Sequence, residues 1–507
     1  MFKKYVKMER MALMKRKIGI MMLVGMLSFT LLGCEKTEEK KPEKIPVDEV
    51  SEETVKIDEV YEQFFDLENP VSIQVQISDE ELNKLQEDYD YYDGINSKSP
   101  IYRMADKVII SVGDAVYEIE EVGIRLKGNT SRVPVYDEDT GEMNLSHYRL
   151  SFNETFDDED YYGEDAKEWD SEEEKQERKD RRFASLKGLE VKWNKNMDGT
   201  HIRELYAYDM FREYGVYAQR VNLCSFGMNG ENFGLVNIYE PVDKEFIEKH
   251  FPKEDQGGDL YKVAWTYKPA NYVESSVTYG VEDPDKGMFY NYDLKTNRSE
   301  SKHENLENML KVINDDNSTK EDFESVIDTE YLEKFMAVSY FVGNPDDYRN
   351  NYNNHYVYFS ASTGKAYFIP YDYDRCLGFT YGWNPDATGM TVVSPYSEDA
   401  EGLGREQVNP FIWKAVLNDD AYCKEGYDKV LSEIAGGDWL KDENFNAYYE
   451  TAKENYEEVT EPTIDFANVD EEFPGFSLEG DYTSNDDSNM SFTEYCKRIL
   501  ESYNSEE

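Results

Sequence analysis

Oxygen-bearing side chains gather at one end of a predicted β-hairpin. Asn354 immediately precedes the strand 355–359, and Asp372 follows the return strand 365–369. Because the two strands have similar lengths, the residues that enter and leave the hairpin return to the same end. Carboxylate and carboxamide oxygens are the ligands of hard divalent cations, so this end is predicted to bind Mg²⁺ or Mn²⁺.

An acidic pair lies just before this hairpin. Asp346 and Asp347 follow Pro345, which cannot continue the preceding helix, so both carboxylates are expected on a loop at the same end. A loop Asp, then an Asn before a hairpin, then an Asp after it is the order of catalytic parts in protein kinases. There the loop Asp handles the acceptor hydroxyl, and the other two residues hold metal ions on the phosphates of ATP. The simpler interpretation is a surface hairpin with polar ends.

The elements around this hairpin predict an α+β chain with two lobes. Residues 59–242 are expected to form a sheet-rich N-terminal nucleotide lobe, and residues 243–460 a helix-rich C-terminal catalytic lobe, with a cleft where they meet. One sheet-rich lobe carrying a helix matches the nucleotide lobe of a protein-kinase-like fold. Strands are predicted at 71–77, 107–112, 116–120, 122–127, 148–153, 221–226 and 233–239, and helices at 79–88, 200–214, 243–251, 303–314, 330–342, 409–435 and 441–457.

Composition excludes some functions. The chain has 55 Lys and Arg against 107 Asp and Glu, a net charge of −52, and this charge would repel a nucleic acid. Aromatic residues make up 14% of the chain, which argues for a folded core rather than a disordered acidic chain. The five Cys and five His do not cluster at zinc-site spacings.

The N-terminus is predicted to be an address rather than a fold element. Basic residues precede a short apolar run, and the segment 1–34 ends at a lipobox-like Leu-Leu-Gly-Cys, so we expect a signal peptide and lipidation at Cys34. Residues 35–58 are expected to be a solvated acidic and Pro-containing linker, and 461–507 an acidic C-terminal region. The mature protein is therefore expected outside the cytoplasm, lipid-anchored to a bacterial cell membrane. An uncleaved anchor with an ordinary cysteine is the alternative.

Several motifs, in order, resemble the CotH kinase family, the spore-coat-type atypical protein kinases. The segments are 123–131 (GIRLKGNTS), 235–243 (LVNIYEPVD), 258–262 (GDLYK), 344–346 (NPD), 354–358 (NHYVY) and 370–378 (PYDYDRCLG). The resemblance covers about residues 68–435. It implies a kinase-like fold that binds ATP with a divalent metal and phosphorylates Ser or Thr of a protein.

The resemblance also implies roles for individual residues. Asp346 matches the loop Asp, with the adjacent Asp347 as the alternative. The implied metal ligands are Asn354 and Asp372 with support from Asp374, and the implied nucleotide-binding residues are Lys127, Arg125, Arg149 and Glu240. The chain departs from the family at Tyr371, where Trp is common, and at Pro345, where an aromatic residue is common.

Some of these roles have structural alternatives. Arg149 could complete a phosphate clamp or form an ordinary salt bridge, and Glu240 could contact the nucleotide at the hinge or begin a helix. Asp209 could be the helix acid that pairs with a strand cation, or could only fix its helix. A surface lipoprotein meets little ATP, so the second functional hypothesis is a non-catalytic, surface-anchored binding module of the same fold. A purely structural or adhesive lipoprotein is the third.

Overall fold

The structure, a computed structural model, describes most of the chain from Asp58 to Ser505. The described residues are 58–95, 97–128, 131–137, 139–263, 272, 277–278, 291–380, 392–397, 408–459, 475–478 and 489–505. The predicted signal segment with Cys34 lies outside the described residues, as do the linker up to residue 57 and much of the predicted C-terminal region. The hairpin and the loop before it are described throughout.

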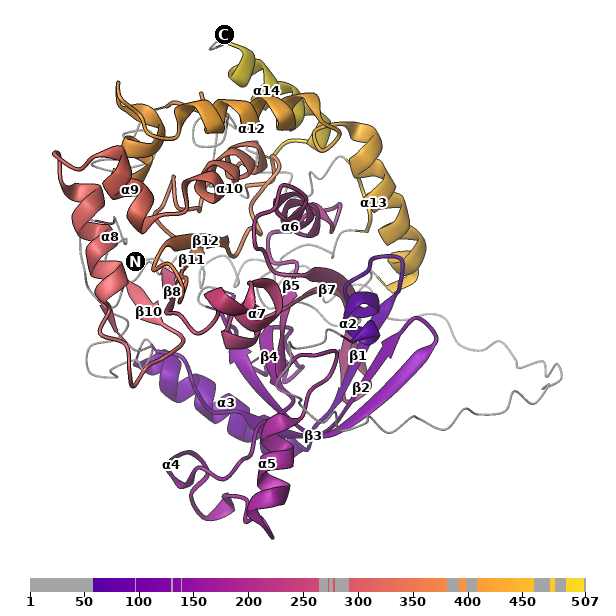
Figure 1. The fold of residues 1–507 in the computed structure, drawn as a ribbon. Helices are drawn as coiled ribbons and strands as arrows, with labels where there is room; N and C mark the ends of the chain where they lie inside the picture. The colour runs from indigo at the N-terminus through magenta and orange to yellow at the C-terminus, as the bar shows by residue number, and fades with distance from the viewer. Residues whose placement is uncertain are drawn as a thin grey trace. The chain divides into compact units, whose positions relative to one another are not determined.

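Seven strands form a closed barrel in the N-terminal part of the described chain. Their order is β1-β2-β3-β4-β5-β7-β6, all neighbours are antiparallel, and a parallel pairing of β1 with β6 closes the barrel (Figure 1). Alternate residues of β1 are buried, as the period-2 pattern predicts. The strands are β1 (Val71–Gln76), β2 (Arg103–Val112), β3 (Ala115–Lys127), β4 (His147–Ser151), β5 (Gly188–Trp193), β6 (Val221–Met228) and β7 (Glu231–Tyr239).

Two features of the barrel differ from the sequence prediction. The strands predicted at 116–120 and 122–127 are one strand, β3, which continues through Glu121 although that residue has a φ of 52°. Lys167, at 2.6 Å, and Arg178 bind the Glu121 carboxylate from the charged insertion 154–182. Strand β5 was not predicted, because its Glu190 and Lys192 continue the charged character of that insertion.

A second sheet lies in the C-terminal part of the described chain. The helices of this part lie above the barrel in Figure 1. Its strand order is β12-β11-β8-β10-β9. The strands are β8 (Leu260–Val263), β9 (Val277–Thr278), β10 (Tyr292–Leu294), β11 (His355–Phe359) and β12 (Ala366–Pro370), so the predicted hairpin is confirmed as β11–β12.

Most predicted helices are confirmed, but one is interrupted. The segment predicted as a helix over 409–435 consists of α11 (Pro410–Ile412), a π-helix (Trp413–Leu417) and α12 (Lys424–Gly436). The other helices of eight residues or more are α3 (Asp79–Gly94), α5 (Glu172–Asp180), α6 (Arg203–Glu213), α8 (Glu304–Asn314), α10 (Thr329–Val342), α13 (Asp442–Tyr456) and α14 (Phe492–Asn504). The shorter helices are α2 (Glu59–Phe64), α4 (Glu159–Tyr162), α7 (Lys244–His250) and α9 (Lys320–Val326), and the 3₁₀ turns are Gly163–Asp165, Lys253–Asp255 and Glu457–Val459.

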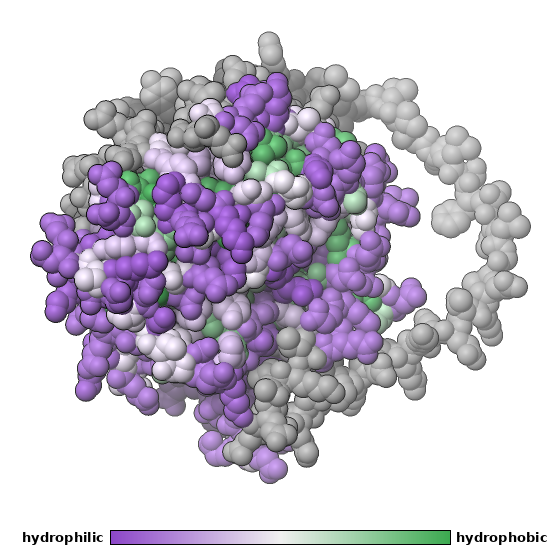
Figure 2. All heavy atoms as spheres, turned by 45° about the horizontal axis from the view of Figure 1, so that its top comes forward, coloured by the Kyte–Doolittle hydropathy of each residue, from purple (hydrophilic) through white to green (hydrophobic). Residues whose placement is uncertain are grey.

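The described residues bury two large apolar clusters. One fills the barrel, and the other joins α6 to the C-terminal helices and the second sheet. The α+β class is therefore confirmed. The face in Figure 2 is mainly hydrophilic, with small hydrophobic patches between the hydrophilic residues. Within the described part of the chain, no helix is both long and apolar enough to span a membrane. Cys224, Cys376, Cys423 and Cys496 are all buried and free.

Candidate active site

The β11–β12 hairpin brings Asn354 and Asp372 to one end, as predicted. His355 lies opposite Pro370 in the ladder, and the N–H of Tyr371 donates to the carbonyl oxygen of Asn354 at 3.1 Å. Asn354 has a φ of 54° and Asp372 a φ of 60°, which are strained values for residues other than glycine. Strain of this kind is typical of functional sites, where the surrounding structure holds it in place.

Asn344 joins the loop after α10 to the residues that follow β12. Its side-chain Nδ2 donates to the carbonyl oxygen of Asp372 at 3.3 Å, and its Oδ1 accepts the N–H of Asp346 at 2.8 Å. Burial raises the pKa of Asp346 to about 6, and the nearby charges of Asp372 and Asp374 act in the same direction. Asn344 therefore holds the backbone of Asp346 beside that of Asp372.

Asp347 lies in a different environment from its neighbour. Its side chain is fully buried and accepts the N–H groups of Arg349 and Asn350 at 2.8 and 3.0 Å. The Arg349 guanidinium lies 3.3 Å from the second carboxylate oxygen. These contacts commit the Asp347 carboxylate to the conformation of its own loop, whereas the Asp346 carboxylate accepts a hydrogen bond from the side chain of Asn351 at 2.7 Å.

Lys192 of β5 links the barrel to the end of the β11–β12 hairpin. Its Nζ lies 2.6 Å from Oδ1 of Asp372 and 3.6 Å from Oε1 of Glu204, which is in the first turn of α6. The lysine side chain is only 4% exposed, whereas that of Asp372 is 38% exposed. Protein kinases need a strand lysine paired with a helix glutamate, and a metal-binding Asp, for activity.

The charges around Lys192 shift the acidity of both carboxyl groups. Burial would raise the pKa of Asp372, but Lys192 and Lys127 hold it well below its usual range, so this group stays ionised. Burial raises the pKa of Glu204 to about 7 despite the attraction of Lys192. The hydroxyl of Tyr239 donates to the second oxygen of Glu204.

Sequence reasoning missed both Lys192 and Glu204. It considered Asp209 as the helix acid, but Asp209 forms an ion pair with Arg212 of the same helix and accepts the hydroxyl of Tyr448 at 3.1 Å. The available signal was the alternation of apolar and charged residues in 188–193, followed shortly by a helix with Glu in its first turn.

Lys127 and Arg149 share one buried carboxylate. Nζ of Lys127 lies 2.6 Å from Glu190, and it donates to the hydroxyl of Tyr371 at 2.6 Å. Arg149 lies 3.5 Å from Glu190 and 3.7 Å from Asp243. Burial would raise the pKa of Glu190, but the two cations lower it to about 2. Both predicted phosphate-binding cations therefore lie at the same junction as Asp372.

Arg125 lies apart from this group. Its guanidinium donates to the carbonyl oxygens of Ser99 and Leu126, each at 3.4 Å, and its Cζ lies 5.1 Å from the centre of the Tyr102 ring. The structure thus does not bring Arg125 into contact with Glu190, although Arg125 faces Arg149 across the β3–β4 ladder.

Glu240 lies at the end of β7 and is fully buried. Its carboxylate binds Lys249 at 3.1 Å and His250 at 2.9 Å, and it accepts the hydroxyl of Tyr61 at 2.9 Å. Burial would raise the pKa of Glu240, but His250 and Lys249 lower it to about 2. The side chain therefore fastens the predicted hinge to α7 and α2.

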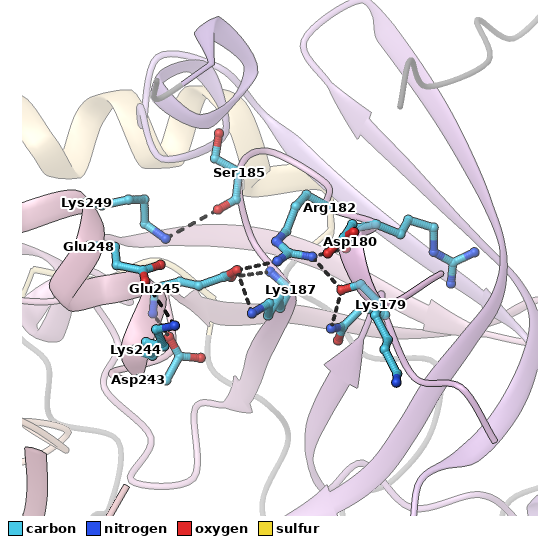
Figure 3. A network of polar contacts seen from close by, with 12 residues as sticks. Lys179, Asp180, Arg182, Ser185, Lys187, Asp243, Lys244, Glu245, Glu248 and Lys249 are labelled. Atoms are coloured by element: carbon cyan, nitrogen blue, oxygen red, sulfur yellow. Dashed lines mark hydrogen bonds and ion pairs between the residues drawn. The ribbon is translucent and has the colours of Figure 1, made fainter. Parts of the chain in front are cut away.

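A further set of polar contacts holds α7 against the segment before β5 (Figure 3). Glu245 of α7 binds Arg182 at 2.7 Å and Lys187 at 3.1 Å, and Lys249 donates to the carbonyl oxygen of Ser185 at 3.3 Å. Asp243 caps α7 by accepting the N–H of Glu245 at 2.9 Å. The helix after the predicted hinge is therefore fixed to the barrel.

Two cavities lie beside these charged groups. A small one, about 30 Å³, has room for about one water molecule and is lined in part by Lys192, Glu204 and Asp374. Burial and the charge of Asp372 raise the pKa of Asp374. The other cavity, about 540 Å³, lies beside α7 and is lined in part by Lys244 and Lys295. Its volume is in the range of small-molecule sites.

The oxygen donors of this site fit a Mg²⁺ or Mn²⁺ ion that takes its remaining ligands from substrate phosphates. The side-chain Nδ2 of Asn354 is buried without a hydrogen-bond partner, and O and N of an amide can exchange places by rotation, so an oxygen ligand fits there. No group of three or more His, Cys, Asp or Glu among the described residues could hold a metal by itself. Mg²⁺ typically needs only one or two carboxylates beside phosphates and water.

The pairing of a strand lysine with a helix glutamate resembles the site of a protein kinase, and comparison with known proteins gives the family of the chain. Residues 125–468, more than half of the chain, match the family described as CotH kinase protein. The chain therefore belongs to the CotH kinase family, which confirms the resemblance seen in its motifs.

Similar individual proteins carry related names. Invasin CotH2 of Rhizopus delemar is 25% identical over 215 residues, 38% of this chain and 34% of that protein. Inner spore coat protein H of Bacillus subtilis is 27% identical over 204 residues, 39% of this chain and 51% of that protein. The chain thus spans about a third and about half of the length of these relatives. A Helicobacter pylori proinflammatory kinase, CtkA, matches with 10% identity over 53% of this chain and 86% of that one, and its TM-score of 0.21 does not define a shared fold.

Proposed function

We propose that this protein is a protein kinase that transfers a phosphoryl group from ATP to Ser or Thr of a protein acceptor, using Mg²⁺ or Mn²⁺. The observation that carries the proposal is the position of Lys192, whose buried ammonium lies between Glu204 of α6 and Asp372 after β12. In protein kinases this pairing must be in place for activity. The proposal includes a two-lobed arrangement, in which the barrel is the nucleotide lobe.

The proposal gives each side chain of the site a role. Asp372 and Asn354 hold the metal ion, with Asp374 in support, and the metal neutralises charge on the phosphates. Lys192 contacts the phosphates and is oriented by Glu204. Asp346 orients the acceptor hydroxyl, and Asp347 keeps the loop in shape. The raised pKa of Asp346 places it nearer to neutrality, where a weak base acts best.

The remaining predicted residues act on the nucleotide in this proposal. Lys127 and Arg149 neutralise phosphate charge from the barrel side, and Glu190 holds both cations in place. Arg125 contributes to the positive charge at the same strand end. The side chain of Glu240 is bound to Lys249 and His250, so Glu240 acts on the nucleotide indirectly, by holding the hinge in position.

Transfer of radiolabelled phosphate tests the proposal. The full chain is incubated with γ-labelled ATP, Mn²⁺ or Mg²⁺, and a Ser-rich protein, with D372N beside it. We expect labelling that needs the metal and falls by at least about a hundredfold in D372N, because metal and charge stabilisation dominate phosphoryl transfer. Full labelling by D372N would remove Asp372 from the site.

A non-catalytic binding module is the second candidate. It is favoured by the pairing of Lys127, whose ammonium is bound to both Glu190 and Tyr371. Tight binding of ATP and metal without transfer to any acceptor would select this candidate over the kinase.

We also propose that the mature protein is anchored to the membrane through a lipid on Cys34. The support is the basic and apolar segment that ends at this cysteine. Fractionation of cells that produce the full chain should place the wild type with membranes and C34S in the soluble fraction. Equal membrane association of both would contradict the lipid anchor.

A further inference from the structure

Three lysines from different strands surround the ring of Tyr371. Nζ of Lys262 lies 4.0 Å from the ring centre, that of Lys127 lies 5.2 Å away, and that of Lys192 lies 5.3 Å away. We call these residues the lysine cluster. Tyr371 directly precedes Asp372, so the cluster lies beside the proposed metal ligand. Such a concentration of positive charge is unusual in a chain with a net charge of −52.

Lys262 differs from the other two members of the cluster. Lys127 has Glu190 and Lys192 has Asp372 as a carboxylate partner, each at 2.6 Å. Among the residues that the structure describes, the contacts of the Lys262 ammonium are with the rings of Tyr371 and Tyr356, and no carboxylate lies within ion-pair distance of it. The lysine is half-buried.

The strand neighbours of Lys262 do not supply an anion. Lys262 of β8 lies opposite Tyr356 of β11 and opposite Asp293 of β10. The Asp293 carboxylate is bound instead to Lys295. Burial and the charges of Lys127, Lys98 and Lys295 lower the pKa of Lys262 well below its usual range, and Asp372 opposes this shift. A half-buried ammonium without a counter-charge is unfavourable, and a bound anion would remove that cost.

We infer that Lys262 is an anion-binding residue of the site, which binds a phosphate oxygen of the nucleotide from the side of β8. This inference rests on the proposed function and extends it to a strand of the second sheet. A phosphate between Lys262, Lys127 and Lys192 would meet cations from three strands, β8, β3 and β5. The same chemistry could also recognise the phosphate of a phosphorylated serine, so the test separates these two sources.

Binding measurements on the full chain test the inference with K262M and K262R. Met keeps most of the side-chain volume but removes the charge, and Arg keeps the charge. The control is K302M, at an exposed lysine outside the site. Affinities for ATP, ADP, adenosine and a phosphoserine peptide are measured by calorimetry in the presence of Mn²⁺, and near-ultraviolet circular dichroism checks the fold of each variant.

We expect K262M to weaken ATP and ADP binding by about ten- to a hundredfold, which is the range for a hydrogen bond to a charged group. Adenosine binding should change less than twofold, since adenosine carries no phosphate, and K262R should retain most of the affinity for ATP. A purely structural role would lower all these affinities together. Wild-type affinity of K262M for ATP would overturn the inference and leave the proposed function intact.

The remaining outcomes are also decisive. If the wild type binds the phosphoserine peptide but not ATP, and K262M binds neither, Lys262 recognises phosphate on a protein and the nucleotide assignment is wrong. If the wild type binds none of the phosphate compounds, both the inference and the proposed function fail.

Discussion

Replacement of Lys192 by Met is the most informative single change. Met keeps the length of the side chain but removes the ammonium that lies 2.6 Å from Asp372 and 3.6 Å from Glu204. Breaking a buried ion pair by removing one partner typically costs about 3–5 kcal/mol of folding stability. Two properties of this site reduce that cost. The Asp372 side chain is 38% exposed, so water screens its charge, and Glu204, with a pKa of about 7 beside the lysine, can take up a proton without it.

We therefore expect K192M to lose about 1–3 kcal/mol of stability, the range for leaving one charged group partly unsatisfied. Its phosphoryl transfer should fall by about a hundred- to a thousandfold, the usual effect of removing one group that stabilises transition-state charge. Stability is measured by denaturant unfolding, and transfer by incorporation of labelled phosphate at saturating ATP.

The control for this change is K107M. Lys107 pairs with Glu118 at 2.9 Å on the barrel surface, where both side chains are about a third exposed, so its loss should cost no more than about 1 kcal/mol and leave transfer unchanged. If K192M does not fold, K192R keeps the charge and should fold with at least about tenfold less activity, because a guanidinium is not equivalent to a point charge here. Transfer by folded K192M within twofold of the wild type would refute the role of Lys192.

Three other predictions concern the carboxyl groups. D346N should abolish transfer but raise the melting temperature by about 2 °C. The amide still accepts the hydrogen bond from Asn351, and the substitution removes a buried carboxyl group whose pKa is raised to about 6. A lower melting temperature would contradict this prediction. D347A should instead lose about 3 kcal/mol or more in denaturant unfolding, since it leaves the Arg349 guanidinium without its carboxylate partner, and a change below about 1 kcal/mol would argue against the structural role. The pKa of Glu204 is raised from 4.5 to about 7, so folding favours the protonated form of this group. Its contribution to the free energy of unfolding is therefore present below pH 4.5 and is lost as the pH rises to about 7. E204Q should therefore be less sensitive to pH than the wild type between pH 4.5 and 7 in melting experiments, and parallel curves would disprove the assignment.

The sequence was sufficient for the hairpin because strand pairing is a local property. Similar strand lengths on either side of a tight turn place Asn354 and Asp372 together whatever surrounds them. The Asn229-Gly230 pair between β6 and β7 is a local hairpin signal of the same kind, and both of these residues have a positive φ. The α+β class also follows from such local periodicities.

The choice between neighbouring carboxylates depends on contacts that the sequence does not contain. Asp346 and Asp347 are adjacent, and Arg349 and the backbone N–H groups after Asp347 decide which of them turns inward. In the same way, the closed barrel depends on the parallel pairing of β1 with β6, which are separated by more than a hundred residues. Strand β5 was missed because it is buried on both faces while carrying Glu190 and Lys192, whose charges are satisfied only by long-range partners.

The location of a bound metal tests the central claim most directly. Crystals of the protein grown with Mn²⁺ and a non-hydrolysable ATP analogue would show the metal by its anomalous scattering. We predict an anomalous peak within coordination distance of the Asp372 carboxylate and the side-chain amide of Asn354, with the analogue's phosphates beside Lys192. A peak elsewhere, or nucleotide bound away from these side chains, would contradict the account.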